Sequence, residues 1–167
     1  REILLLEFSS SILSLILAGK VGSNIASEIG TMRVTEQIDA MEIMGINSAN
    51  FIVLPKIIGF VLFIPVLGIL SMFFGLLGGA IIAKFTTMLT LDTYIYGIQS
   101  FFNEWYIWYS LIKCLVFAFI ITSIAAYYGY HVKGGSLEVG QASTKAVVSS
   151  SIIILLADVI LTKLLLQ

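Results

Sequence analysis

Charged residues are scarce in this chain. Asp, Glu, Lys and Arg make up only 11% of its 167 residues, whereas 59% are hydrophobic, and the mean hydropathy is +1.04. Soluble domains carry about 25% charged residues, so this composition excludes an ordinary soluble protein and predicts several membrane-spanning helices. With a net charge of -1, the chain also lacks the basic footprint of a nucleic-acid-binding protein.

Cysteine and histidine are almost absent. The single cysteine, Cys114, excludes an intrachain disulfide and any CxxC metal or redox motif. The single histidine, His131, has no metal-ligating neighbours in the sequence, which favours an ordinary surface residue over a metal or catalytic site. There is no phosphate loop of the form G-x-x-x-x-G-K-[ST] and no supported Ser-His-Asp arrangement. We therefore expect no enzymatic activity and no cofactor in this chain, so that any ATP and Mg²⁺ belong to a separate subunit.

Lys and Arg are also missing between Lys84 and Lys113, where aromatic residues are frequent. Platforms that stack nucleic-acid bases interleave aromatic with basic residues, so this segment is not one of them. Trp and Tyr gather instead where a membrane meets water. Residues 86–107 are therefore predicted to lie at one membrane surface, with a short interfacial helix that begins at Asp92.

Long apolar runs predict an all-α integral membrane protein with a single transmembrane domain over residues 1–167. The predicted spans cover approximately residues 3–25, 53–83, 108–128 and 146–166. Basic residues beside the spans favour a cytoplasmic location for the polar loop after the first span. This assignment places Lys20, Arg33, Lys56, Lys133 and Lys145 inside, against Arg1, Lys84, Lys113 and Lys163 outside.

Small residues recur every four positions in the first two spans, and such a ladder lets another helix approach closely in lipid. Close packing is the simplest role for these positions, although the same smooth surface can also border a lipid cavity. The residues assigned to helix packing are Ala18, Gly22, Ala26, Gly75 and Gly79, whereas Ser10 and Ser14 are candidates for lining a lipid cavity.

Ionisable residues in or near a span indicate function by default. Arg1 and Glu2 either contact a lipid head group or extend to the membrane interface, and the sequence leaves both interpretations open. Glu7 lies deeper, where a carboxylate must be neutral, paired or hydrated. We treat these three as candidate lipid-cavity residues. Asp158, in the last span, is expected to be a hydrogen-bond partner between helices rather than a gating group.

The most charge-dense block connects the first two spans. Apolar residues recur in it at helical spacing and predict a short amphipathic helix over about residues 31–45: Val34, Ile38, Met41 and Met44. Thr31 suits the N-cap of this helix, and Gly45 suits a left-handed end. Its acidic polar face argues against binding to anionic lipid, whereas flexible Met side chains suit a groove on a cytoplasmic partner. A connector folded onto its own protein is the alternative.

Three stretches of sequence resemble the MlaE-type permeases of phospholipid-transporting ABC systems: residues 28–46 (EIGTMRVTEQIDAMEIMGI), residues 18–23 (AGKVGS) and Pro55-Lys56. A run of this length is far more specific than a short motif. In that family an Arg-Glu pair opens the first helix near the lipid-binding cavity, which Arg1-Glu2 resembles. The Gly-Pro that usually follows the pair is absent here.

The resemblance implies a homodimeric permease in the inner membrane of a Gram-negative-type bacterium. Its coupling helix docks on a cytoplasmic ABC ATPase subunit, with an MCE-domain protein in the periplasm and a small accessory cytoplasmic subunit as further partners. The cargo is phospholipid, and the aromatic segment and the C-terminus are periplasmic. Members of the family carry a further N-terminal region, so we expect this sequence to be incomplete at its N-terminus. The residues expected to contact the ATPase are Glu28, Thr31, Arg33, Glu36, Ile38, Asp39, Met41, Glu42 and Met44.

Two other functions are compatible with the sequence. One is a membrane scaffold that anchors partner subunits without transport, and the other is a permease for a different apolar cargo, such as a steroid. A permease for a small polar solute is disfavoured, because the spans offer few convergent polar groups.

Overall fold

The structure, a computed structural model, describes residues 4–85, 91–100 and 103–166. Every regular element in these ranges is a helix. Four segments are long and apolar enough to cross a membrane: Leu4–Val34, Ala49–Phe85, Trp105–Tyr130 and Ser136–Leu165. The prediction of an all-α membrane protein with four spans in this chain is confirmed.

The first two spans contain π-helical turns. The first consists of η1 (Leu4–Ile12), α1 (Leu13–Leu17), η2 (Ala18–Gly22) and α2 (Ser23–Val34), and the second of η3 (Ala49–Val53) and α4 (Leu54–Phe85). A π-helix is wider than an α-helix and is frequent at functional sites. In η1 the Ser9 hydroxyl donates to the Leu4 carbonyl at 2.7 Å, five residues back. η1 therefore presents its side chains in a register that a regular α-helix does not give.

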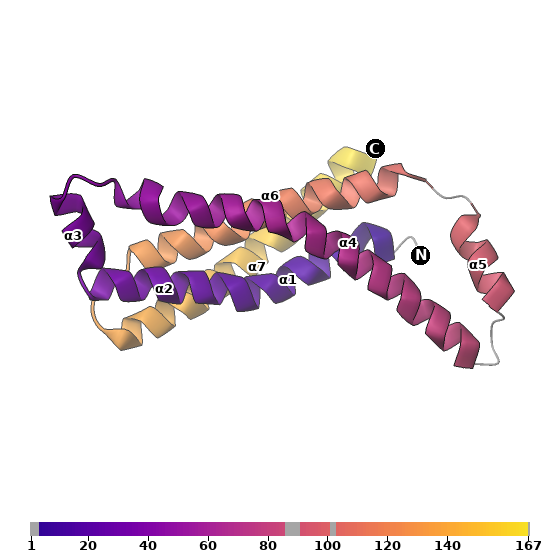
Figure 1. Ribbon diagram of the computed structural model, residues 1–167, viewed down its shortest axis with the longest axis horizontal. Helices are drawn as coiled ribbons and strands as arrows, with labels where there is room; N and C mark the ends of the chain where they lie inside the picture. The colour runs from indigo at the N-terminus through magenta and orange to yellow at the C-terminus, as the bar shows by residue number, and fades with distance from the viewer. Residues whose placement is uncertain (1–3, 86–90, 101–102, 167) are drawn as a thin grey trace.

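The loop between the first two spans differs from its prediction. Helix α2 continues to Val34, and a separate helix, α3 (Gln37–Ile43), follows a left-handed Glu36 with φ 59°. Thr31 lies inside α2, where its hydroxyl donates to the Ser27 carbonyl at 2.8 Å, so its predicted role as N-cap is wrong. Gly45 has the expected left-handed conformation, with φ 78°. The single helix predicted over residues 31–45 is thus two helices at an angle to each other (Figure 1).

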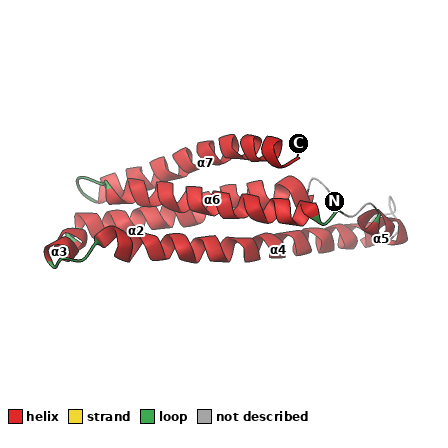
Figure 2. Cartoon of the chain, turned by 90° about the horizontal axis from the view of Figure 1, so that it is seen from above, coloured by secondary structure: helices red, strands yellow, loops and turns green. Residues whose placement is uncertain are grey.

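The remaining elements are α5 (Leu91–Gln99), α6 (Trp105–Tyr130) and α7 (Ser136–Leu166). The four spans lie lengthwise beside one another, with α3 near one end and α5 at the other (Figures 1 and 2). Helix α4 runs without a break through Pro65, and its second half diverges from the other spans toward α5 (Figure 1). The connection between the last two spans, predicted over 108–128 and 146–166, is shorter than expected, because α6 extends to Tyr130 and α7 already begins at Ser136.

Helix α6 forms the centre of the bundle. It packs against the first span, α4 and α7. In its most apolar 18-residue stretch 44% is buried, compared with 11% in the corresponding stretch of α7. One buried cluster joins all four spans: Ala18, Phe60, Ile64, Cys114, Phe117, Ala118, Ile121 and Ile154. The outward faces of α4 and α7 carry exposed large apolar side chains, as expected for surfaces that face lipid.

Small residues bring α2 and α6 close together. A Cβ atom added to Gly129 would lie 2.7 Å from the Ala26 carbonyl oxygen, and one added to Gly22 would lie 3.3 Å from the Ile121 side chain. Ala18 and Ala26 have no exposed surface. The ladder of the first span therefore packs against a helix of the same chain, which is how small residues serve membrane helices.

At Gly75 and Gly79, α4 contacts side chains of other elements rather than the backbone of another helix. Leu4 packs on Gly75, and the Tyr94 hydroxyl of α5 lies against Gly79 and donates to the Leu76 carbonyl at 2.9 Å. These two glycines thus anchor η1 and α5 to the divergent half of α4.

The contact at Gly129 yields a stability prediction. Gly129→Ala forces the backbones of α2 and α6 apart and lowers the free energy of unfolding by about 1–3 kcal/mol, the usual cost of overpacking. Gly59→Ala, also within a helix but with nothing within 4 Å of the added methyl group, is the matched control. It should change stability by less than about 1 kcal/mol. Thermal unfolding in mild detergent measures both, and equal melting temperatures would contradict the tight α2–α6 contact.

Candidate functional site

A lysine buried inside the bundle is held between two carboxylates. Lys113 of α6 has no exposed side-chain surface, and its ammonium nitrogen lies 2.9 Å from Glu7 Oε1 of η1 and 2.7 Å from Asp158 Oδ1 of α7. The Glu7 side chain is 38% exposed and that of Asp158 is 18% exposed. A charge removed from water is stable only when paired and hydrogen-bonded, and here both partners come from other helices. We call Glu7, Lys113 and Asp158 the charge cluster.

Hydroxyl groups surround the charge cluster. Ser11 Oγ lies 3.0 Å from Glu7 Oε2 and 2.8 Å from Asp158 Oδ1. The Tyr109 hydroxyl donates to Thr162 Oγ1 at 2.9 Å, and Thr162 donates to the Asp158 carbonyl at 2.7 Å. The Lys113 ammonium also lies 4.6 Å from the centre of the Tyr109 ring, a cation–π distance. η1, α6 and α7 are thus joined by one polar network.

The sequence singled out two members of the charge cluster and gave the third no role in a site. Glu7 was expected to be neutral, paired or hydrated, and Lys113 pairs with it. Asp158 was expected to link helices, and it accepts from Ser11 of η1 and Lys113 of α6. Lys113 was counted only among the basic residues on the outer side, and the structure buries it within α6, which begins at Trp105. Its position within an apolar run was the signal that could have revealed it.

The charge cluster predicts a specific pattern of stability. Lys113→Met leaves the acidic side chains of the cluster without their cation and lowers the free energy of unfolding by about 3 kcal/mol, the lower end of the cost of breaking a buried ion pair. The triple variant Glu7→Gln, Lys113→Met, Asp158→Asn removes every charge and should regain most of that loss. Chemical unfolding in detergent distinguishes the two, and a triple variant no more stable than Lys113→Met would contradict the ion-pair explanation.

A second polar network lies at the opposite end of the bundle and fixes α3. Arg33 of α2 pairs with Asp39 of α3 at 2.6 Å. The Tyr130 hydroxyl at the end of α6 donates to Glu42 Oε1 at 2.8 Å and lies 2.8 Å from the hydroxyl of the buried Ser48. These contacts tie α3 to both α2 and α6. We call Arg33, Asp39, Glu42, Ser48 and Tyr130 the loop clamp.

The apolar stripe of the loop is divided between the core and the surface, and its contact with a partner stays a prediction. Ile38 has no exposed surface, and Met41 packs on the core formed by α2 and α6. Exposed apolar side chains lie at the end of the helix: Ile43 of α3, 87% exposed, and the next residue, Met44 of the stripe, 67% exposed. The physical reason is the break at Glu36, which rotates α3 relative to the helix that periodicity alone predicts.

Hydrogen bonding lowers the pKa of the Glu42 carboxyl. The largest cause is the bond from Tyr130, followed by the bond from Ser48. Both donors stabilise the ionised form, which raises the acidity of the group. The loop clamp therefore contributes stability while Glu42 is ionised.

This shift predicts an acid-sensitive contact. A carboxyl whose pKa is lower in the folded state stabilises the fold above its ordinary value of 4.5, and that contribution is lost as pH falls through the lowered pKa. Tyr130→Phe removes the main donor to Glu42, so it should destabilise the protein more at neutral pH than once Glu42 is protonated. Melting temperatures of both proteins across this pH range test the expectation, and a difference independent of pH would contradict it.

The other residues expected to couple to a partner lie in or beside α2. Glu28 pairs with Lys56 of α4 at 2.7 Å, which joins the first two spans. Glu36 is exposed and supplies the left-handed turn. Among the lipid-cavity candidates, Ser10 and Ser14 are fully buried against neighbouring helices. Arg1 and Glu2 lie outside the described residues.

Two apolar hollows meet where η1, α4 and α5 come together. The first, about 440 Å³, is lined by Leu4, Gly75, Leu76, Gly79, Thr93, Tyr94, Gly97 and Ile98. The second, about 260 Å³, is lined by Leu5, Ile69, Met72, Phe73, Leu76, Ile98 and Ile107. They share Leu76 and Ile98, so they form adjoining parts of one groove, which we call the η1 groove. Its apolar walls suit a hydrocarbon chain.

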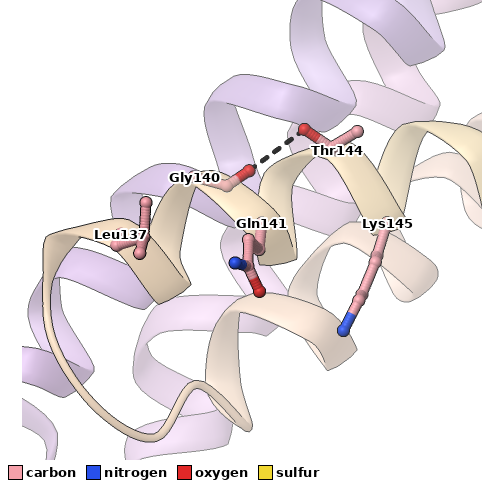
Figure 3. A pocket seen from close by; sticks show the side chains of 5 residues that line it. All are labelled: Leu137, Gly140, Gln141, Thr144 and Lys145. Carbon is pink, nitrogen blue, oxygen red and sulfur yellow. Dashed lines mark hydrogen bonds between the residues drawn. The ribbon is translucent and has the colours of Figure 1, made fainter.

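A third hollow is less suited to a ligand. Figure 3 shows it on the first turns of α7, where Leu137, Gly140, Gln141, Thr144 and Lys145 line it. All five residues come from the same helix, and the Thr144 hydroxyl donates to the Gly140 carbonyl at 3.1 Å. Because no second element contributes to its lining, no groups converge on a bound molecule.

The fold and these sites define a multi-pass membrane protein with a polar network at each end of its bundle. Residues 1–164 match the family described as Permease MlaE, and the chain belongs to this family.

Similar proteins from several bacteria carry names that are consistent with this family. The chain is 37% identical over 158 residues to a probable ABC transporter permease protein of Rickettsia bellii and 35% identical over 161 residues to one of Synechocystis. It is 32% identical over 160 residues to the intermembrane phospholipid transport system permease protein MlaE of Haemophilus influenzae. These alignments cover 95%, 96% and 95% of this chain and 61% of each relative. The chain thus spans about three fifths of the length of these relatives.

Proposed function

We propose that this protein is the permease subunit of an ABC transporter that moves phospholipids. The observation that carries the proposal is the position of η1. Its first residues, Leu4 and Leu5, line an apolar groove, and Glu7 in the same turn belongs to the charge cluster. A phospholipid combines apolar tails with a charged head group, so it needs both environments next to each other. Membership in a family that includes a named phospholipid permease supports this choice.

ATP hydrolysis is assigned to a separate subunit that docks on α3. The exposed Ile43 and Met44 give this helix an apolar contact surface, and the loop clamp holds it firmly against α2 and α6. A helix fixed in this way can transmit the movement of a docked ATPase to the spans as a rigid-body shift. This arrangement replaces the inward-facing Ile38 and Met41 as the expected points of contact.

The remaining parts of the assembly follow from the same proposal. Two copies of the full-length permease form a homodimer in the bacterial inner membrane, with α3 and the ATPase on the cytoplasmic side. An MCE-domain protein receives or delivers lipid on the periplasmic side, where α5 lies at the membrane surface. A small accessory cytoplasmic subunit completes the complex. The names of the relatives, ABC transporter permease and intermembrane phospholipid transport permease, support these assignments.

Native mass spectrometry of the full-length protein, extracted gently from its own membrane, tests the proposal. The expected complex contains two permeases, an ATPase, an MCE-domain protein and retained phospholipid. Ile43→Asp places a charge on the docking surface and should reduce the bound ATPase at least tenfold, a loss of about 1.4 kcal/mol or more, while leaving phospholipid bound. Leu137→Asp, an equally drastic change at an exposed position off α3, is the control.

Each alternative gives a different result. A scaffold would retain its partners without bound lipid, and its ATPase turnover would not respond to added phospholipid. A permease for another apolar cargo would retain that molecule in place of phospholipid. Recovery of wild-type ATPase levels with Ile43→Asp would reject α3 as the docking element but leave the identity of the cargo untouched.

A further inference from the structure

The charge cluster does not balance its charges. Lys113 contributes one positive charge, and Glu7 and Asp158 contribute two negative charges if both are ionised. Among the described residues these charges would then sum to -1 within the membrane-spanning helices, where an uncompensated charge is costly. Two carboxylates in one site also repel each other, which favours the uptake of a proton by one of them.

The hydrogen-bond geometry provides a second, independent argument. Ser11 Oγ lies within hydrogen-bond distance of both Glu7 Oε2 and Asp158 Oδ1, at 3.0 and 2.8 Å. A serine hydroxyl carries one hydrogen and can donate it to only one acceptor at a time. With both carboxyls ionised, the two contacts must share the one Ser11 hydrogen, whereas a protonated carboxyl group gives each contact a hydrogen of its own.

We propose that the charge cluster binds one proton, held on Glu7 Oε2 and donated to Ser11 Oγ, while the Ser11 hydroxyl donates to ionised Asp158. Lys113 then donates to Oε1 of the Glu7 carboxyl group and to the Asp158 carboxylate. Every short contact has one hydrogen, and the cluster is neutral.

Glu7 is the protonated member because Asp158 receives the shorter hydrogen bonds, which stabilise its ionised form. Asp158 Oδ1 receives both Lys113, at 2.7 Å, and Ser11, whereas Glu7 Oε1 lies 2.9 Å from Lys113. The Tyr109 and Thr162 hydroxyls are 3.5 Å from Glu7 Oε1, and each has a closer acceptor in Thr162 Oγ1 and the Asp158 carbonyl. Among the described residues, the ionisable groups facing Glu7 are Lys113 and Tyr109 from α6 and Asp158 from α7, while α4 meets η1 through Leu4 and Gly75.

Glu7 is 38% exposed within this chain, so the chain's own side chains do not enclose the proton. When it leaves, the Glu7–Ser11 hydrogen bond is lost and the cluster gains one negative charge. Both changes act on the junction of η1, α6 and α7. The site therefore links the protonation of one carboxyl to the contact between three spans, whatever molecule the protein transports.

Infrared spectroscopy of the full-length protein in lipid bilayers at neutral pH tests the proposal, because a protonated carboxylic acid has a carbonyl stretch that a carboxylate lacks. The wild type should show this band with a downshift in D₂O. Glu7→Gln keeps the shape of the side chain and should remove the Glu7 component. Glu104→Gln, the same change at an exposed position, should leave the spectrum unaltered.

Ser11→Ala provides a check that leaves all three charged residues in place. It removes the acceptor of the Glu7 proton, so the band should persist at a higher frequency, as for a carboxylic acid without a hydrogen-bond acceptor. Identical carboxylic-acid absorbance in the wild type and Glu7→Gln would overturn the proposal, whether the band is absent from both or present in both. The result does not depend on transport, so it is independent of the proposed function.

Discussion

The pairing of Lys113 with Glu7 and Asp158 is the interaction on which the arrangement of the spans depends. A lysine with no exposed surface cannot extend its ammonium group to water, so its charge must be compensated within the bundle. The side chains that contact the ammonium group come from η1 on one side and α7 on the other. This requirement fixes how far along α6 each neighbour lies and which face each presents.

Close packing between helices also determines how the spans are arranged. On the side toward α3, α6 approaches α2 at Gly129 and Ala26, where no side chain larger than hydrogen fits at the first position. Near the charge cluster, Cys114 packs against Gly68 of α4. Membrane helices gain little from the hydrophobic effect between themselves, so such contacts, together with hydrogen bonds, determine which helices associate. Helix α6 carries both kinds of contact and therefore occupies the centre.

The same helix connects the two polar networks. Lys113 lies in the first half of α6, and Tyr130 ends it and belongs to the loop clamp. Between them the helix is continuous and closely packed on three sides. A displacement of α3 that moves Tyr130 therefore acts on the helix that holds the charge cluster. This physical connection explains how an event at the loop can reach the site where η1 joins an apolar groove to charged groups.

Several features followed from local patterns. The four spans could be predicted because apolar runs of this length have few alternatives, and the left-handed Gly45 because glycine adopts that conformation at little cost. The orientation of α3 could not be predicted in this way. Helical periodicity assumes an unbroken helix, and a left-handed Glu36 is a conformation that residue type does not favour, so it is set by tertiary contacts.

The sequence by itself therefore determined the class of protein, the number of spans in this chain and the polar residues that needed an explanation. Composition and periodicity are enough for these, because the cost of exposing polar backbone to lipid leaves helices as the only outcome for such apolar runs. Only the tertiary structure decided which charges meet. Lys113 is 106 positions from Glu7 in the chain. Pairing at this separation depends on how the spans pack, which no local pattern records.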